Sequence, residues 1–190
     1  YTNEECSDLW VTPKRGGSWY DGGIYFRLNQ HKWLYDDAHF LGNWRRAYTA
    51  INNCNRLLFE FANAGVNNDM VMAELKVARA FWYYILIDMF GNIPLVTQYD
   101  TPEGWLPETS KRADVFQFIV SEISQNMEHL ADKSYGRWDK NAASMLLAKV
   151  YLNAEIWEGK GVTYWDEVIG LCDDIIGSHQ YQLEADYKSP

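Results

Sequence analysis

The stretch Asp69–Gly91, DMVMAELKVARAFWYYILIDMFG, decides the fold class of this chain of 190 residues. Apolar side chains recur along it every three or four residues, as on one face of an α-helix. The expected apolar face is lined by Val71, Leu75, Ala78, Trp82, Ile85 and Met89. The second half of the stretch is apolar nearly all round, so we expect it to be buried on several sides. Gly91 is suited to end the helix, and Pro94 cannot continue it.

The same periodicity appears in four other stretches. It predicts helices over about 43–63, 113–132, 140–157 and 164–176, with Asp139 as the N-cap of the helix that begins at 140. Residues 1–41 are loop-rich, because glycines and a proline interrupt them. The sequence therefore predicts an all-α fold of stacked antiparallel helix pairs, a tetratricopeptide-like helical repeat with a loop-rich aromatic N-terminal segment and no sheet beyond a short hairpin.

The expected organisation is one domain over residues 1–190, with an aromatic loop region over 1–41 and helical repeats over 42–180. The last predicted helix has no partner after it, and the polar segment from Tyr181 to Pro190 forms no finished element. A repeat array normally closes with a capping unit whose outer face is polar. We therefore expect the chain to be part of a longer protein, and the face of residues 164–176 to be more apolar than a monomer tolerates.

Composition and charge argue against several classes of protein. There are 17 Lys and Arg against 26 Asp and Glu, a net charge of −9, and phosphate-backbone binding requires clustered cations, so we expect no nucleic-acid partner. Cys6, Cys54 and Cys172 show no CxxC spacing, which excludes a disulfide framework and gives no zinc pattern. The longest apolar run, Ala80–Ile87, is far shorter than the ~20 residues of a membrane span. The first residues do not resemble a signal peptide, so we expect either a cytoplasmic protein or one whose targeting segment has been removed.

The sequence matches none of the common catalytic templates. It contains no GxGxxG, GxxxxGK[ST], HExxH or GxSxG motif. His31 and His39 have no third ligand at a recognisable spacing, so we predict no metal site and no cofactor. Carboxylates are plentiful, and glycoside hydrolysis needs two of them roughly 5–10 Å apart, a distance that a sequence does not determine. An enzyme therefore remains as an alternative.

Aromatic side chains gather between Cys6 and Asp37. This segment, CSDLWVTPKRGGSWYDGGIYFRLNQHKWLYDD, mixes seven aromatic residues with acidic, basic and amide side chains. Pyranose rings present a flat apolar C–H face and an edge of hydroxyls, so a sugar site needs exposed aromatic planes beside polar groups. The alternative is that the aromatic residues only cap the helices, with about three of the seven buried in either case. Composition alone does not decide between the two readings.

A set of motifs resembles the SusD/RagB family, in the family's order and over nearly the whole chain. The motifs are the run Trp44–Leu58, AELKVARAFWYY at 73–84, FGNIPLV at 90–96, GRW at 136–138, AA at 142–143, LLAKVYL at 146–152 and the closing IIG and YQL at 175–177 and 181–183. Each is weak alone, and together they are specific. Lys149 stands where Arg is commoner, which keeps the charge but forfeits bidentate bonding. Cys6 is not the family's lipid-modified cysteine, because no lipobox precedes it.

The resemblance implies a surface-exposed lipoprotein of the outer membrane that binds oligo- or polysaccharide. It implies a second partner as well, a SusC-like TonB-dependent transporter to which the glycan is handed, and a membrane anchor made by a lipid that is not present in this chain. It implies no catalysis. The alternatives are an α-helical glycoside hydrolase and a helical-repeat scaffold for protein partners.

The resemblance and the aromatic segment together suggest a substrate-binding site. Its predicted stacking residues are Trp19, Tyr20 and Trp33, and its predicted hydroxyl partners are Asp8, Arg15 and Asp21. Four further polar residues have expected structural roles: Glu74 and Arg79 in buried ion pairs that orient helices, Asn52 and Asn55 in hydrogen bonds to loop backbone. The identity of the glycan does not follow from the sequence.

Overall fold

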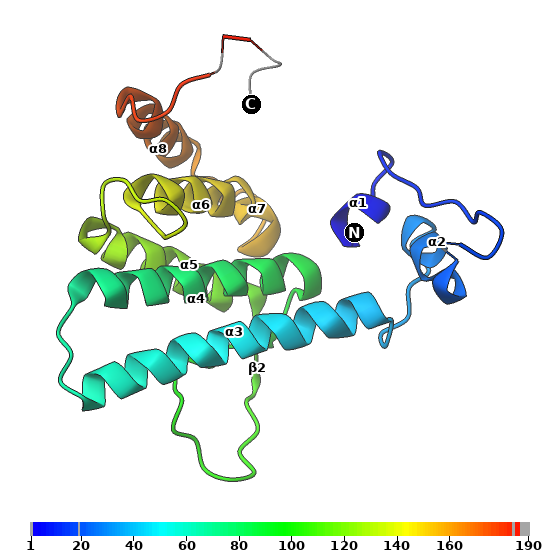
Figure 1. Cartoon of the computed structure of the whole chain (residues 1–190), viewed down its shortest axis with the longest axis horizontal. Helices are drawn as coiled ribbons and strands as arrows, with labels where there is room; N and C mark the ends of the chain where they lie inside the picture. The colour runs from blue at the N-terminus through cyan, green and yellow to red at the C-terminus, as the bar shows by residue number, and fades with distance from the viewer. Residues whose placement is uncertain (1, 19, 184, 187–190) are drawn as a thin grey trace. The chain divides into compact units, whose positions relative to one another are not determined.

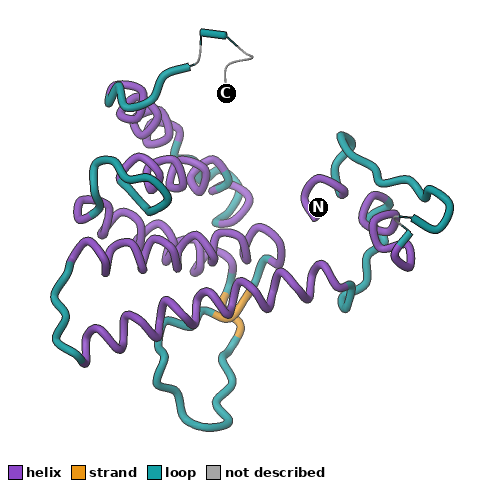
Figure 2. The backbone as a smooth tube through the Cα atoms, viewed as in Figure 1, coloured by secondary structure: helices purple, strands orange, loops and turns teal. Residues whose placement is uncertain are grey.

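The computed structural model describes residues 2–18, 20–183 and 185–186. Its helices, of which α1 to α8 are labelled in Figure 1, are α1 (Thr2–Glu5), η1 (Asp21–Gly23), α2 (Ile24–Asn29), α3 (Ala38–Asn63), α4 (Asp69–Phe90), α5 (Arg112–Asn126), η2 (Met127–His129), α6 (Lys140–Leu152), α7 (Ala154–Trp157) and α8 (Trp165–Gly177). Two short strands, β1 (Ile93–Pro94) and β2 (Thr109–Ser110), pair antiparallel (Figure 2). The predicted all-α class is confirmed.

The chain forms two compact units, each with most of its contacts inside itself: an N-terminal unit of residues 1–48 and a C-terminal unit of residues 49–190. The boundary falls inside α3, so one continuous helix contributes to both units. The expectation of a single domain stays a prediction.

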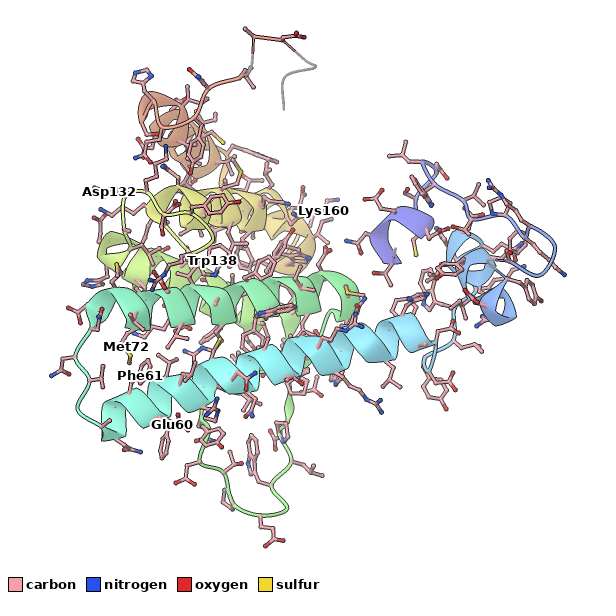
Figure 3. The ribbon with its side chains drawn as sticks, in the orientation of Figure 1. Glu60, Phe61, Met72, Asp132, Trp138 and Lys160 are labelled. Atoms are coloured by element: carbon pink, nitrogen blue, oxygen red, sulfur yellow. The ribbon has the colours of Figure 1, made fainter. Side chains whose placement is uncertain are left out.

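The C-terminal unit is built from antiparallel helices, and its polar contacts give the register of α4 against α5. Lys76 bonds to Asn126, Arg79 to Glu122, and the Tyr83 ring meets the Phe118 ring edge-on at 5.5 Å. The partner numbers fall as the α4 numbers rise, so the two helices run in opposite directions. The side chains of Phe61 on α3 and Met72 on α4 lie between those helices (Figure 3).

The helices α6 and α8 form a second antiparallel pair. The Tyr151 and Tyr164 rings stack at 4.6 Å at one end of this pair, and Met145 and Ile175 line one cavity toward the other end. The core between the pairs is apolar and fully enclosed, because Val115, Phe116 and Val150 have no exposed surface. Stacked antiparallel pairs are therefore present as predicted.

A buried polar network joins α3, α4 and α5. The Arg79 guanidinium donates to the Glu122 carboxylate at 2.7 and 2.9 Å and to the amide oxygen of Asn55 at 2.7 Å. Glu74 pairs with Arg137 at 2.6 Å, although Arg137 is half exposed. Arg79 thus forms the predicted buried pair between two helices, whereas the Glu74 pair joins α4 to a half-exposed residue of the loop before α6. Asn52, by contrast, is exposed.

The apolar register of α4 differs from the prediction. Its fully buried residues include Ala73, Val77 and Ala80, whereas the expected face, which begins at Val71 and Leu75, is half-buried. The helix is apolar nearly all round, so two faces show the same spacing and periodicity alone does not select between them. Tertiary packing selects the face that carries Arg79.

The helix predicted over 140–157 is two helices in the structure. α6 ends at Leu152 and α7 begins at Ala154, because Asn153 has a non-helical ψ of 6°. The Asn153 amide donates to the Lys149 carbonyl at 2.9 Å, and a side chain that bonds nearby backbone competes with continuation of the helix. The N-terminal segment is also more helical than predicted, since α1 and α2 lie within it and α3 begins at Ala38.

The N-cap of α6 provides a first test of the fold. Asp139 accepts a hydrogen bond from the Ala142 N–H at 2.8 Å with one oxygen and from the Ser134 N–H at 3.0 Å with the other. We expect Asp139→Ala to lower the free energy of unfolding by about 1–2 kcal/mol, because both donors lose their partner. Urea unfolding measures the loss. Asp139→Asn, which keeps one acceptor, should retain most of the stability, and equal losses in the two variants would contradict the capping role.

The outer side of α8 is exposed. The helix has no fully buried side chain, and Trp165, Ile169 and Ile176 are among its exposed apolar residues.

Among the described residues, no helix combines the length and apolar character needed to cross a bilayer.

Candidate functional site

The aromatic segment lies in the N-terminal unit, where α2 provides the framework. Tyr25 and Leu28 of this helix are buried, one turn apart, and Phe26 points to the other side with 49% of its surface exposed. The 3.6-residue period of the helix therefore determines that Phe26 faces solvent. Of the six described aromatic residues between Cys6 and Asp37, only Tyr25 is buried.

Hydrogen bonds attach the preceding loop to these helices. Glu5 of α1 has no exposed surface, and its carboxylate accepts hydrogen bonds from both the backbone N–H and the hydroxyl of Thr12. The Asn29 amide donates to the Trp10 carbonyl at 3.3 Å, and the His31 ring lies 2.8 Å from the Cys6 carbonyl. The first half of the loop is therefore held in place at Cys6, Trp10 and Thr12.

An ion pair fixes the chain between α2 and α3. The Arg27 guanidinium donates to the Asp37 carboxylate and to the Gly22 carbonyl at 2.8 Å, and Asp37 accepts the Leu34 N–H at 2.8 Å. The hydrogen bond from Arg27 is the largest cause that lowers the pKa of Asp37 below its ordinary value. Asp37 therefore stays ionised at neutral pH and holds the turn that follows Trp33.

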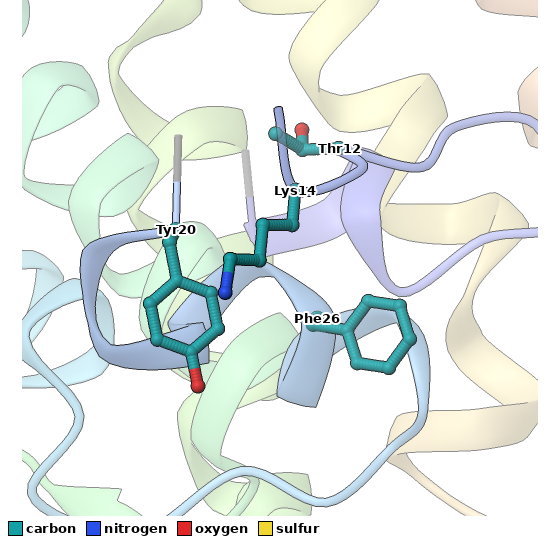
Figure 4. Close-up of a pocket in the computed structure, with 4 residues that line it drawn as sticks. All are labelled: Thr12, Lys14, Tyr20 and Phe26. Carbon is teal, nitrogen blue, oxygen red and sulfur yellow. The ribbon is translucent and has the colours of Figure 1, made fainter. Parts of the chain in front are cut away.

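Three side chains of this unit surround a small cavity of about 190 Å³, together with Thr12. Tyr20 and Phe26 are half exposed at its sides, and the Lys14 side chain extends between them (Figure 4). The Lys14 ammonium lies 4.6 Å from the centroid of the Tyr20 ring, a cation–π distance. The cavity thus combines two aromatic planes with the Lys14 amine and the hydroxyls of Thr12 and Tyr20.

Glycines place the Tyr20 ring. Gly22 and Gly23 have φ angles of +66° and +80°, which L side chains rarely adopt. A Cβ at Gly23 would meet the Tyr20 ring at 3.6 Å, so the ring lies directly against this backbone. The Asp-Gly-Gly turn therefore presents Tyr20 beside the start of α2.

Trp33 belongs to a second ring cluster. Its ring lies 5.6 Å from the His31 ring and 5.8 Å from the Phe40 ring, and 44% of its surface is exposed. Tyr20 and Trp33 are thus held in separate ring contacts. The two predicted stacking residues that the structure describes, Tyr20 and Trp33, therefore do not contact each other.

The other predicted site residues lie apart on the surface. Asp8, Arg15 and Asp21 are exposed, and the backbone of Arg15 bridges Ser18 in a tight turn. Asp21 opens η1 with a φ of +40°. Trp19 lies outside the described residues. No group of three or more His, Cys, Asp or Glu side chains in the described part of the chain could hold a metal ion.

The sequence analysis missed Phe26, Lys14 and Thr12. A short helix at Ile24–Asn29 would have indicated Phe26, because Tyr25 and Leu28 occupy the buried face. Lys14 and Thr12 carry no such signal, and Thr12 is held by hydrogen bonds to the buried carboxylate of Glu5. Half-exposed rings can stack on the flat faces of a ligand, and donors beside them can form hydrogen bonds to its hydroxyl groups.

Stacked helix pairs and a segment of half-exposed rings define the architecture of a helical-repeat binding protein. A family model, SusD-like, described as "Starch-binding associating with outer membrane", matches residues 7–152. The chain therefore belongs to the SusD-like family. The starch-binding protein SusD of Bacteroides thetaiotaomicron is 31% identical over 119 residues, which are 61% of this chain and 20% of that protein.

Solved structures share the fold. A SusD superfamily protein from Parabacteroides distasonis is 25% identical with a TM-score of 0.77, over 86% of this chain and 37% of that one. Surface glycan-binding protein A from Bacteroides uniformis has a TM-score of 0.76 at 20% identity, over 92% of this chain and 39% of that one. This chain thus spans between about one fifth and two fifths of the length of these proteins.

Proposed function

We propose that this chain binds oligo- or polysaccharide through the aromatic segment of its N-terminal unit, without catalysis. The observation that carries the proposal is the cavity in which half-exposed Tyr20 and Phe26 flank the Lys14 amine. Aromatic planes can stack on the apolar faces of sugar rings, and the amine can donate to hydroxyls. The SusD-like family's description as starch-binding supports a glycan as the ligand.

The proposal retains the predicted residues and adds two. Trp33 provides a second exposed plane, and the exposed groups of Asp8, Arg15 and Asp21 can bond to hydroxyls. Trp19 keeps its proposed stacking role on the basis of the sequence alone. Phe26 and Lys14 join this set. Rings in separate clusters suit an extended polymer better than one enclosed sugar, because each cluster can contact a different residue of the polymer.

Family membership supports the wider role. The family's association with the outer membrane favours a surface-exposed, lipid-anchored position, from which the glycan is handed to a SusC-like TonB-dependent transporter. In this role the chain retains ligand and the transporter moves it. Capture without bond cleavage is sufficient for such a protein.

The site is tested by substituting its rings one at a time. We expect Tyr20→Ala, Phe26→Ala and Trp33→Ala each to weaken polysaccharide binding by about 1–3 kcal/mol, by analogy with base stacking on aromatic side chains. Retardation in native gels that contain amylopectin or laminarin measures binding, and thermal unfolding checks the fold.

The matched control is Tyr35→Ala, since Tyr35 is 94% exposed and does not line the cavity. It should leave retardation unchanged. Lowered melting with full retardation in the three variants would contradict the proposal and show that these rings only stabilise the N-terminal unit. Release of reducing sugar from either glucan would favour the hydrolase instead.

A further inference from the structure

A second set of exposed rings lies in the C-terminal unit, on the loop Leu95–Glu108 between β1 and β2. Tyr99 and Trp105 of this loop are each 39% exposed. Phe59 of α3, also 39% exposed, lies beside Tyr99 with ring centroids 5.9 Å apart. The loop extends from the two strands as an open arc (Figures 1 and 2). These rings belong to neither cluster of the N-terminal unit.

The base of this loop is fixed by hydrogen bonds to three buried side chains of α3 and α4. The Tyr83 hydroxyl lies 2.7 Å from both the N–H and the carbonyl of Val96, accepting from one and donating to the other. The Asn55 amide donates to the same carbonyl at 2.9 Å, and Arg79 donates to the Thr97 carbonyl at 3.2 Å. Burial raises the pKa of Tyr83 to about 12, so its hydroxyl remains a donor at every physiological pH.

The far part of the loop is also shaped locally. The Trp105 N–H donates to the Pro102 carbonyl at 3.1 Å, and Gly104 has a φ of +78°, which closes a tight turn just before the Trp105 ring. The pairing of β1 with β2 brings the loop's two ends together. The exposed rings therefore stand on a preorganised loop, which reduces the ordering entropy that a ligand would have to offset.

The charge of the loop restricts the ligand. Residues 95–110 contain Asp100, Glu103 and Glu108 and no Lys, Arg or His. Carboxylates and the Gln98 amide can accept hydrogen bonds from sugar hydroxyls, whereas they repel the carboxylates and sulfates of acidic polysaccharides.

We propose that Tyr99, Trp105 and Phe59 form a second glycan-binding platform, selective for neutral polysaccharide. The inference rests on the proposed function, since it assigns a further site for the same class of ligand. A platform in the C-terminal unit would give the chain a second place at which the same class of ligand binds. Because the loop extends as an open arc, the platform suits the middle of a polymer as well as its ends.

The test compares loop variants with a control from the same loop. Tyr99→Ala combined with Trp105→Ala is expected to weaken retardation by amylopectin or laminarin about 5- to 150-fold, the range of base stacking on aromatic side chains. Leu106→Ala is the control, because Leu106 is 84% exposed and carries no ring. All three proteins should melt at the same temperature. Polygalacturonate, an acidic polymer, should retard none of them through this loop.

An NMR signal from Trp105 itself distinguishes direct contact with the glycan from indirect effects of the substitutions. We expect the ¹⁹F resonance of Trp105 in 5-fluorotryptophan-labelled protein, assigned with Trp105→Phe, to shift on addition of the neutral glucan. The shift should persist when Tyr20 and Trp33 are replaced by alanine, since the platform lies in the other unit. An unmoved Trp105 resonance, or full retardation of the double loop variant, overturns the platform and leaves the loop as a protein-facing or packing element.

The two proposals fail differently. If the loop variant binds as the wild type does while Tyr20→Ala and Trp33→Ala weaken binding, the platform is wrong and the proposed function stands. If the N-terminal variants bind as the wild type does while the loop variant is weakened, the platform is the glycan site and the proposed N-terminal site is wrong. If neither glucan retards the wild type, both proposals are overturned.

Discussion

Replacing Glu122 by alanine is expected to lower the free energy of unfolding by about 3–5 kcal/mol, because it leaves a buried cation without its partner. The Arg79 and Glu122 side chains are only 7% and 13% exposed, and two guanidinium N–H groups share one carboxylate oxygen. Without Glu122, Arg79 keeps only the Asn55 amide oxygen and the Thr97 carbonyl as acceptors. Urea-induced unfolding followed by circular dichroism measures the loss.

Glu60→Ala is the matched control for this prediction. Glu60 also pairs with an arginine, Arg56, but both side chains are at least 40% exposed. Exposed pairs of this kind contribute roughly 0.2–1 kcal/mol. Equal losses for Glu60→Ala and Glu122→Ala would show that burial of the Arg79 pair does not matter.

The pH dependence provides a second measurement on the same residue. Burial raises the pKa of Glu122 above its ordinary value of 4.5, and the attraction of Arg79 only partly offsets that. A group whose pKa is higher in the folded than in the unfolded state contributes its full stabilisation at pH values below its unfolded-state pKa. That contribution is lost as the pH rises through its folded-state pKa. The unfolding free energy of wild type minus that of Glu122→Gln should therefore decrease as pH rises above 4.5. A difference that increases over this range would contradict the assignment.

Trp157→Ala is the second substitution with a large expected effect, again about 3–5 kcal/mol of unfolding free energy. Trp157 is 4% exposed, and its ring lies 5.7 Å from the Tyr84 ring and 6.4 Å from the Phe116 ring. It is the last residue of α7, so this four-residue helix loses its main apolar anchor with the ring. Thermal and urea unfolding report the loss.

The comparison for Trp157 is another tryptophan of the same unit. Trp165 at the start of α8 is 52% exposed, so Trp165→Ala should cost much less stability than Trp157→Ala. Trp157→Phe should recover part of the loss, because a smaller ring still fills some of the cavity. A Trp157→Ala protein that unfolds at the wild-type urea concentration would contradict the anchoring role.

The helices could be predicted from sequence because their signals are local. Apolar spacing defined α4 at both ends, and Asp139 and Gly91 marked a start and a stop that the structure confirms. The packed face of α4 could not be predicted, because the partner that selects it, Glu122 on α5, is 43 residues away in the sequence. The break at Asn153 depends on one amide that turns back to its own helix.

The residue types of the candidate site could be predicted from the sequence, but which of its side chains lie together could not. The sequence indicated an aromatic, polar segment, and Tyr20 and Trp33 are half exposed there. Which rings share a cavity depends on where loops are anchored, and those anchors are hydrogen bonds between separate segments, such as the one from the Asn29 amide to the Trp10 carbonyl. The loop ring Trp105 had no helical or strand pattern around it, so only its exposure in the folded chain identifies it.

The short sheet formed by β1 and β2 separates the loop of residues 95–108 from the helices that carry it. Ile93 pairs with Ser110, Pro94 pairs with Thr109, and the Asn92 amide oxygen accepts the Arg112 N–H at the start of α5. Doubling the length of a flexible loop between fixed ends costs only about 0.6 kcal/mol. The tip between Gln98 and Pro107 is therefore a natural position for loop exchange. New loops grafted there would change what the protein recognises while its helical framework is inherited unaltered.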